Sequence, residues 1–240
     1  MYQIQVETHS HTIVSKHAYS TLQENIKATL DAGMKGLCMT NHAPAIPDAP
    51  SEVHFTCLKY LPGEIDGIRF FKGAEANIID YQGGLDLSNS ILAMLDWVIA
   101  SIHTPCLKPA SVEEITNTYL RVLENPYVHC LGHIGQQSYL CDWEAVVKHA
   151  KEMGKIIELN NHSLEGIRPG AKELCTKVAA LCKKHGCRVA VSSDAHYSGC
   201  IGNYKLVKEM LTEVDFPKEL IVNTSLDTFE AYLKEAKQQF

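Results

Sequence analysis

Short apolar runs rich in β-branched residues alternate along this chain with longer segments of helical periodicity. One run, Trp97-Val98-Ile99-Ala100, is apolar without interruption, which is typical of a strand buried on both faces of a parallel sheet. We predict seven strands from such runs, over residues 2–8, 35–40, 68–73, 96–102, 128–132, 155–160 and 188–193.

The segments between these runs carry signals for the start and end of helices. Ser20 and Thr21 each stand three residues before a Gln or Glu, as in a capping box, and Gly33 follows where a helix would end. Residues 43–67 are rich in proline and acidic residues, and we predict a long loop there with one helical turn at most. The other predicted helices begin at Ser111, run from Asp142 to Gly154, and span 171–185, 201–213 and 226–238.

This alternation of strands and helices continues through the whole chain and predicts the α/β class. Seven βα units in 240 residues favour one domain over 1–240, folded as a distorted (β/α)7 TIM-like barrel. A doubly wound parallel sheet is the alternative architecture.

The overall composition is ordinary for a soluble protein, with 45% hydrophobic and 21% charged residues. A net charge of −6 argues against a long nucleic-acid track, and no apolar run is long enough to predict a membrane span or a membrane partner. The nine cysteines are diffusely spaced without a C-x-x-C pair, so we expect reduced thiols and a cytoplasmic location.

Histidine is the unusual component, because 12 of the 240 residues are histidines. His9 and His11 follow the first predicted strand, where residues two apart point to the same face and can bind one metal ion together. Asp194 and His196 repeat this spacing after the seventh strand. An isolated H-x-H pair is weak evidence by itself, because a lone histidine is more often a structural polar residue.

The carboxyl ends of the predicted strands add the stronger argument. In an α/β barrel these ends meet at one mouth, where functional residues collect. Six of the seven predicted strands place His, Asp or Glu at that end, which chance placement of structural residues does not explain. The candidate metal ligands are His9, His11, His17, His42, Glu75, His103, His133, Asp194 and His196.

The other histidines fit structural roles better. His54 falls in the proline-rich segment, and His149 and His185 fall in predicted helices. His129 begins the fifth strand, so we expect it at the opposite end of the barrel from His133. His162 follows the sixth strand near the mouth, where a substrate contact and a solvated loop position are both open.

The set H-x-H-x5-H, T-N-H, G-x-E, S-I-H, G-H and S-D-A-H resembles the PHP superfamily, named for polymerase and histidinol phosphatase. The similarity spans nearly the whole chain and is greatest to the small stand-alone bacterial phosphatases of the YcdX-like branch. The motifs that carry this part of the resemblance are Ser15-Lys16-His17-Ala18-Tyr19-Ser20-Thr21, Gly73-Ala74-Glu75-Ala76-Asn77-Ile78 and Glu158-Leu159-Asn160-Asn161.

The resemblance implies a distorted (β/α)7 barrel with three divalent transition-metal ions per chain, zinc above all, or manganese or iron. It assigns His9, His11, Glu75 and Asp194 to the first ion. It assigns Glu75, His103 and His133 to the second ion, and His17, His42 and His196 to the third. The chain has Asn41 where the family often has Asp, and Ile134 where it often has Pro; neither change removes a ligand.

The chemistry of these donors favours phosphate ester hydrolysis. Seven imidazoles and two carboxylates suit zinc, iron or manganese better than magnesium, and a carboxylate such as Glu75 can bridge two ions. Clustered ions lower the pKa of bound water to about 7 and bind the oxygens of a phosphoryl group. Three ions match the three terminal oxygens of a phosphate monoester, so we expect a small phosphorylated metabolite as the substrate.

Substrate contacts are predicted after the sixth strand, which carries no ligand, at Asn160 and Arg168, and beside His17, at Lys16. The cationic side chains of Arg168 and Lys16 suit a phosphate, although a solvated loop position is equally open for Arg168. Three other functions remain open: a metal-dependent amide hydrolase, an exonuclease-type phosphodiesterase, and a metal-binding module without catalysis. The sequence predicts neither the natural substrate nor the oligomeric state.

Overall fold

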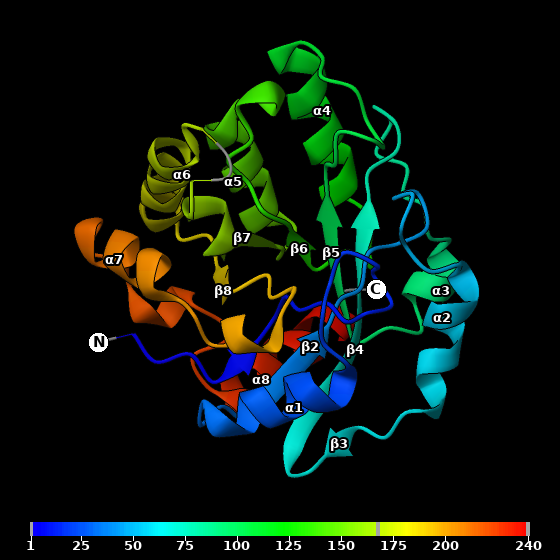
Figure 1. The fold of residues 1–240 in the computed structure, drawn as a ribbon. Helices are drawn as coiled ribbons and strands as arrows, with labels where there is room; N and C mark the ends of the chain where they lie inside the picture. The colour runs from blue at the N-terminus through cyan, green and yellow to red at the C-terminus, as the bar shows by residue number, and fades with distance from the viewer. Residues whose placement is uncertain (1, 167–168, 239–240) are drawn as a thin grey trace.

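The core of the protein is a nearly closed barrel of parallel strands surrounded by helices (Figure 1). The computed structural model describes residues 2–166 and 169–238. Seven parallel strands pair in chain order, which is the order of a barrel and not of a doubly wound sheet. They are β1 (Val6–Glu7), β2 (Gly36–Met39), β4 (Ile68–Asn77), β5 (Trp97–Ser101), β6 (Cys130–Leu131), β7 (Ile156–Asn160) and β8 (Val189–Ser192).

All seven strands lie where the apolar runs predict them, although most are shorter. The exception is β4, which continues four residues beyond the predicted end at Gly73. Its last part contains Glu75, a polar residue that the hydrophobic pattern places at a strand end. The structure buries Glu75 completely inside the sheet, where it pairs with Ile99 of β5.

The segment 43–67 contains more structure than predicted, so the prediction of a long loop is wrong. It forms α2 (Glu52–Cys57), a 3-10 turn (Leu58–Tyr60) and β3 (Glu64–Ile65), which pairs antiparallel with β4. The turn between β3 and β4 is Asp66-Gly67, and both residues have positive φ angles, 50° and 78°. Asp-Gly with this geometry is a strong hairpin signal that the proline-rich composition obscured.

The helices follow the predicted periodicity closely. The match is complete for α6 and α8, whereas α7 begins at residue 205 and not at 201, because Gly202 has a positive φ of 80° that a helix does not allow. Thr21 and Glu24 form the predicted capping box of α1. The helices are α1 (Leu22–Asp31), α3 (Asn89–Leu92), α4 (Val112–Leu123), α5 (Trp143–Glu152), α6 (Ala171–His185), α7 (Lys205–Glu213) and α8 (Leu226–Gln238).

The apolar core has two parts that leave only one end of the barrel free. A large cluster fills the space between the strands and the surrounding helices. A smaller cluster fills the amino end of the barrel, where Phe229 and Tyr232 of α8 pack against Trp97. No helix in the described ranges is long and apolar enough to cross a membrane.

The interior of the barrel changes from apolar to polar along each strand. On β7, Ile156 belongs to the apolar cluster, Glu158 comes two residues later, and Asn160 ends the strand. Residues two apart on a strand share a face, so the carboxyl end of the barrel receives the polar side chains. This end is therefore the position available for a functional site.

Candidate metal centre

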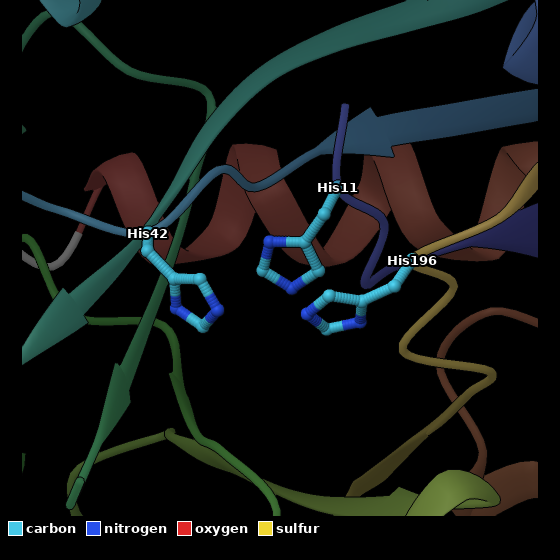
Figure 2. Close-up of side chains that lie close together, drawn as sticks. All are labelled: His11, His42 and His196. Carbon is cyan, nitrogen blue, oxygen red and sulfur yellow. The ribbon is translucent and has the colours of Figure 1, made fainter. Parts of the chain in front are cut away.

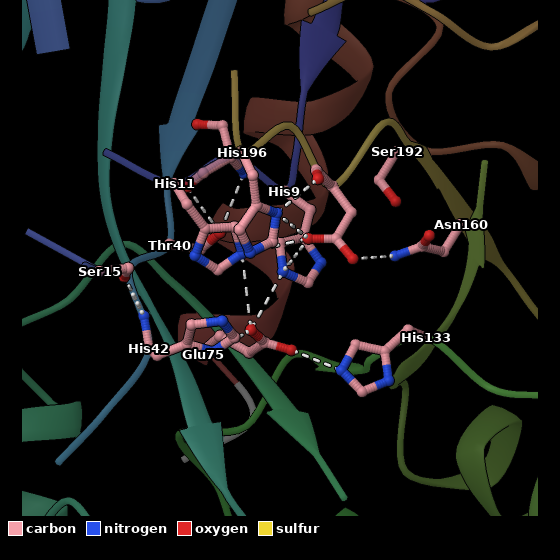
Figure 3. A network of polar contacts seen from close by, with 12 residues as sticks. His9, His11, Ser15, Thr40, His42, Glu75, His133, Asn160, Ser192 and His196 are labelled. Atoms are coloured by element: carbon pink, nitrogen blue, oxygen red, sulfur yellow. Dashed lines mark hydrogen bonds and ion pairs between the residues drawn. The ribbon is translucent and has the colours of Figure 1, made fainter. Parts of the chain in front are cut away.

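All nine candidate ligands lie together at the carboxyl end of the barrel. Figure 3 shows His9, His11, His42, Glu75, His133 and His196 among them. Their rings and carboxylates surround a pocket of about 370 Å³ that opens at the mouth. Its lining residues are His17, His42, His103, His133, His162, Asp194 and His196. The remaining candidates, His9, His11 and Glu75, are fully buried beneath it.

Glu75 is at the centre of this arrangement, because its two oxygens face different histidines. Its Oε2 atom lies 2.7 Å from His42 Nδ1 and 3.3 Å from His9 Nε2. Its Oε1 atom lies 2.8 Å from His133 Nε2 and 3.5 Å from His103 Nε2. A carboxylate with this geometry can bridge two cations, one on each oxygen.

Several buried polar atoms of this cluster approach one another without making hydrogen bonds. Among the described residues, both oxygens of Glu75, His9 Nε2 and His42 Nδ1 are buried and lack hydrogen-bond partners. His103 Nε2 and His133 Nε2 also face each other at 2.9 Å. Unpaired buried polar atoms are costly. Lone pairs that converge from nitrogen and oxygen donors are what a bound transition-metal ion would satisfy, so these residues fit such ions.

Three triads of the described residues bring their ligand atoms within 4.8 Å of one another. Figure 2 shows one of them, in which the rings of His11, His42 and His196 are turned toward a common point. A second triad is His9, His11 and Glu75, and the third combines His42 and Glu75 with His103. The triads overlap the three ligand sets that the family resemblance implies without reproducing them, so the assignment of each ligand to an ion stays a prediction.

Hydrogen bonds fix which nitrogen of a ring is free to bind a metal. His9 Nδ1 lies 2.6 Å from Glu158 Oε1, and His103 Nδ1 lies 2.7 Å from Asn77 Oδ1. Both partners are acceptors, so Nδ1 carries the hydrogen and Nε2 presents its lone pair to the cluster. Carboxylate or carbonyl partners of this kind orient metal-binding histidines and raise their basicity.

Glu158 contacts two of the candidate ligands, and no role is predicted for it from the sequence. Besides His9, it accepts hydrogen bonds from Ser192 Oγ at 2.7 Å and from the backbone N–H of His133. His133 has a φ angle of 22°, an unusual value for a non-glycine residue, and this hydrogen bond helps to hold it. The available signal was a charged residue inside an otherwise apolar strand, since a buried carboxylate needs several hydrogen-bond donors.

The electrostatics keep most of the cluster in the protonation states that bind metals. Burial lowers the pKa of His103 to about 3 and, with the nearby His196 and His42, holds the pKa of His11 well below its usual value. Burial alone would raise the pKa of Glu75, but the surrounding histidines lower it well below the usual range. Neutral imidazoles and an ionised carboxylate are the metal-binding forms.

His9 is the exception among the buried rings. Burial lowers its pKa, but Asp194, Glu158 and Glu75 together raise it well above the ordinary value. Three carboxylates around one imidazole create a negative potential at the base of the pocket. A bound cation would neutralise this potential.

The predicted substrate contacts fall in different places. Lys16 is exposed on the loop before α1, and Arg168 lies outside the described residues. Asn160 is buried, and its Nδ2 atom donates to Asp194 Oδ2 at 3.1 Å. His162 lines the pocket, and its Nδ1 atom lies 2.9 Å from Glu165 Oε2. These contacts leave the predicted roles of Asn160, Arg168 and Lys16 as predictions.

Asn41 stands where members of the PHP superfamily often have Asp. It is not a candidate ligand, but its side chain binds the loop between His11 and His17. Its Oδ1 atom accepts hydrogen bonds from Thr12 N at 2.8 Å and Ser15 Oγ at 3.1 Å. Ser15 Oγ in turn accepts from the backbone N–H of His42 at 3.1 Å. An amide oxygen serves this purpose as a carboxylate would. His54, predicted in a loop, lies instead on α2, 3.4 Å from Asn41 Nδ2.

Comparison with known proteins identifies the family. The model of the PHP domain matches residues 7–168 of this chain, which include Glu158 and seven of the nine candidate ligands, all but Asp194 and His196. The chain belongs to the PHP family. A probable phosphatase of Acetivibrio thermocellus is 46% identical over 98% of this PHP chain and 97% of its own length. A probable phosphatase of Caldicellulosiruptor bescii is 44% identical over 96% of each chain.

A solved structure supports the fold. The histidinol phosphate phosphatase of Lactococcus lactis, determined with zinc, L-histidinol and phosphate, superposes with a TM-score of 0.65. The alignment covers 90% of this chain and 95% of that one, at 15% sequence identity. The likeness confirms the predicted (β/α)7 TIM-like barrel.

Proposed function

We propose that this protein is a metal-dependent phosphatase that hydrolyses small phosphate monoesters at a three-metal centre. The observation that carries the proposal is Glu75, whose two oxygens face separate groups of histidines at the base of an open pocket. The names of the two bacterial relatives support phosphatase activity. The phosphate and zinc in the Lactococcus lactis structure support the same chemistry.

In this proposal each ion is held by one part of the cluster. When bound, the ions would lower the pKa of a water molecule to about 7 and bind the oxygens of the phosphoryl group. The ligand sets are His9, His11, Glu75 and Asp194 for the first ion, Glu75, His103 and His133 for the second, and His17, His42 and His196 for the third.

The residues of the chain supply position and protonation state. Glu158 and Asn77 keep Nδ1 of their histidines protonated, so the Nε2 lone pairs point into the cluster. Asn160 holds Asp194 through its side-chain amide. The reaction adds the oxygen of water to phosphorus and breaks the P–O bond to the alcohol, which leaves with a proton.

The pocket favours a small substrate. A volume of about 370 Å³ is at the lower end of the range for small-molecule sites, and the histidines at its wall leave the mouth open to solvent. We retain Arg168, Asn160 and Lys16 as proposed contacts of the phosphate or of its leaving group. Lys16 is next to His17 in the chain and Asn160 donates to Asp194, which supports the assignment of these two, whereas Arg168 is proposed from its charge alone.

Metal content and phosphate release test the proposal together. We expect about three transition-metal ions per chain by elemental analysis, and release of phosphate from p-nitrophenyl phosphate. His103→Ala should abolish this activity. His185→Ala is the matched control, because His185 pairs with Glu144 on the outer helices and should leave activity unchanged.

Several results would contradict the proposal. One ion or none per chain would overturn the three-metal centre, and full activity in His103→Ala would overturn the assigned site. Faster hydrolysis of bis(p-nitrophenyl) phosphate would favour a phosphodiesterase. Cleavage of N-acyl amides without phosphate release would favour an amide hydrolase.

A further inference from the structure

The sheet of the barrel has one gap, between β1 and β8, which we call the seam. The paired strands begin with β1 and end with β8, and these two strands do not pair with each other. Beyond them, a single isolated bridge between Ser10 and Ala195 joins the two segments. Four proposed ligands lie on the segments that meet here: His9, His11, Asp194 and His196.

The relative position of these ligands therefore depends on this one bridge and on side-chain contacts, and not on a continuous strand pairing. His9 and Asp194 come from opposite ends of the chain, yet His9 Nε2 lies 3.4 Å from Asp194 Oδ1. Asp194 also has a φ angle of 56°, in the left-handed region that a non-glycine residue adopts only when its surroundings impose it. Two backbone hydrogen bonds of the bridge, from His11 N to Ala195 O at 2.8 Å and from Ala195 N to His9 O at 3.3 Å, join the segments, and a side chain that contacts both backbones adds to them.

Glu7 crosses the seam and meets this need. Its Oε1 atom accepts hydrogen bonds from the backbone N–H of His9 at 3.2 Å and of Ser193 at 3.1 Å. Its Oε2 atom accepts from Ser193 Oγ and from Tyr204 Oη, the latter at 2.9 Å. The side chain is fully buried. On one side of the seam, the carboxylate of Glu7 thus binds the backbone of His9, a proposed ligand. On the other side it binds Ser193, the residue before the proposed ligand Asp194.

The chemistry of these contacts explains why a carboxylate occupies the position. Four donors converge on Glu7, and a carboxylate has four lone-pair positions and no hydrogen of its own. The Oε1 atom of Glu7 reaches the backbone N–H groups of both His9 and Ser193, which requires a side chain of this length. The metal cluster does not use Glu7 as a ligand, because its oxygens are occupied at the seam.

Asn223 offers a comparison within the same seam. Its Nδ2 atom donates to Val6 O at 2.8 Å and to Val191 O at 2.7 Å, and its Oδ1 atom accepts from Val191 N at 3.0 Å. This amide replaces the missing strand pairing. It holds the seam three residues away from His9 and Asp194 and makes no contact with a proposed ligand among the described residues.

We propose that Glu7 is a positioning residue that sets the placement of His9 relative to Asp194 and so forms the first metal position. This inference rests on the metal centre of the proposed function. Asn223 then stabilises the same seam without shaping the metal position. The two residues can be separated by experiment, because one should act on metal binding and the other on folding alone.

The test compares Glu7→Ala, Glu7→Gln and Asn223→Ala in the full-length protein. Cobalt(II) is added to metal-free protein, and binding is followed by elemental analysis and by the visible absorption of the bound cobalt. We expect Glu7→Ala to bind one cobalt ion about 10- to 100-fold more weakly, with a changed spectrum. Glu7→Gln should restore both, because its amide oxygen accepts the two backbone N–H groups while the hydroxyls reorient.

Asn223→Ala should lower the melting temperature but keep the wild-type cobalt stoichiometry and spectrum. If Glu7→Ala does not fold, Glu7→Asp replaces it, since the shorter carboxylate keeps the charge but cannot span both amides. Wild-type cobalt binding in the Glu7 variant, or equal loss in Asn223→Ala, would overturn the inference. Absence of metal binding by the wild type would instead overturn the proposed function and, with it, the inference.

Discussion

His103 and His129 show how two ends of one barrel use the same residue differently. Both histidines are largely buried, and burial lowers the pKa of each to about 3. At the carboxyl end, His103 Nε2 faces His133 and Glu75. At the amino end, the His129 ring stacks on Trp97, and its Nδ1 atom accepts the backbone N–H of Val98 at 3.1 Å.

The comparison shows that a perturbed pKa marks burial and does not by itself mark function. Apolar side chains of α8 and β5 surround His129, and this burial favours its neutral form, as expected of a structural residue. His103 has a similarly low pKa, but its Nε2 atom lies 2.9 Å from His133 Nε2 and 3.5 Å from the unpaired Oε1 atom of Glu75. The convergence of lone pairs, and not the low pKa, distinguishes the proposed site.

The largest expected effect is at the carboxyl end. Glu75→Gln removes the charge and one bridging oxygen between two histidine groups, so phosphatase kcat/KM should fall roughly 10³-fold, with loss of metal. Phosphate release and elemental analysis on the same samples measure this. His129→Leu is the control at the amino end and should keep full activity per folded molecule. An equal loss of activity in both variants would contradict the proposal that only the carboxyl end of the barrel carries the site.

Removal of metal should change the melting temperature differently in variants at the two ends of the barrel. At free-ion concentrations of about 1,000 times Kd, one bound ion stabilises a protein by about 4 kcal/mol. For a chain of this length, chelation should therefore lower the melting temperature by roughly 10 °C. His129→Leu should show the same shift, whereas His103→Ala should show a smaller one. A chelator that leaves the wild-type melting temperature unchanged would contradict the metal centre.

A smaller effect concerns His129 alone. Replacing it with Leu leaves the N–H of Val98 without an acceptor, so the free energy of unfolding at pH 7.5 should fall by about 1–3 kcal/mol. Denaturant unfolding of the metal-free proteins measures this loss. Metal-free samples keep the metal centre from contributing to the difference.

The same pair of proteins should respond differently to acid. Between the ordinary pKa of 6.5 and the folded value of about 3, only the unfolded chain binds a proton at His129. The contribution of His129 is therefore fully present above pH 6.5 and is lost as the pH falls toward 3. The stability difference between wild type and His129→Leu should shrink by about 1 kcal/mol per pH unit below pH 6. Parallel stability curves would contradict the low pKa.

The strand ends made most of the candidate site predictable. His9, His103 and Asp194 follow short apolar runs directly, and parallel strands bring their carboxyl ends together. Their mutual distances depend on strand stagger and ring rotation, which spacing in the sequence does not determine. The same limit applies to Glu75, because a fully buried carboxylate inside β4 looks like the end of a strand in a hydrophobic pattern.

The residues that position the cluster were harder to predict. Glu7 and Glu158 bind backbone N–H groups of residues far away in the chain, and such contacts exist only after the barrel has formed. A charged residue inside a strand is the only local signal. The β3–β4 hairpin was missed for a different reason, since the Asp66-Gly67 turn signal stood at the edge of a proline-rich segment.

The seam has a consequence for the order in which the protein becomes active during its synthesis. Strands β1 to β7 pair in chain order, so a growing chain can assemble them one after another. His9 and His11 then lie at an unpaired edge of the sheet until β8 and Asn223 have been synthesised. The proposed ligand sets of the first and third ions are complete only when the first and last parts of the chain meet, because these sets include Asp194 and His196.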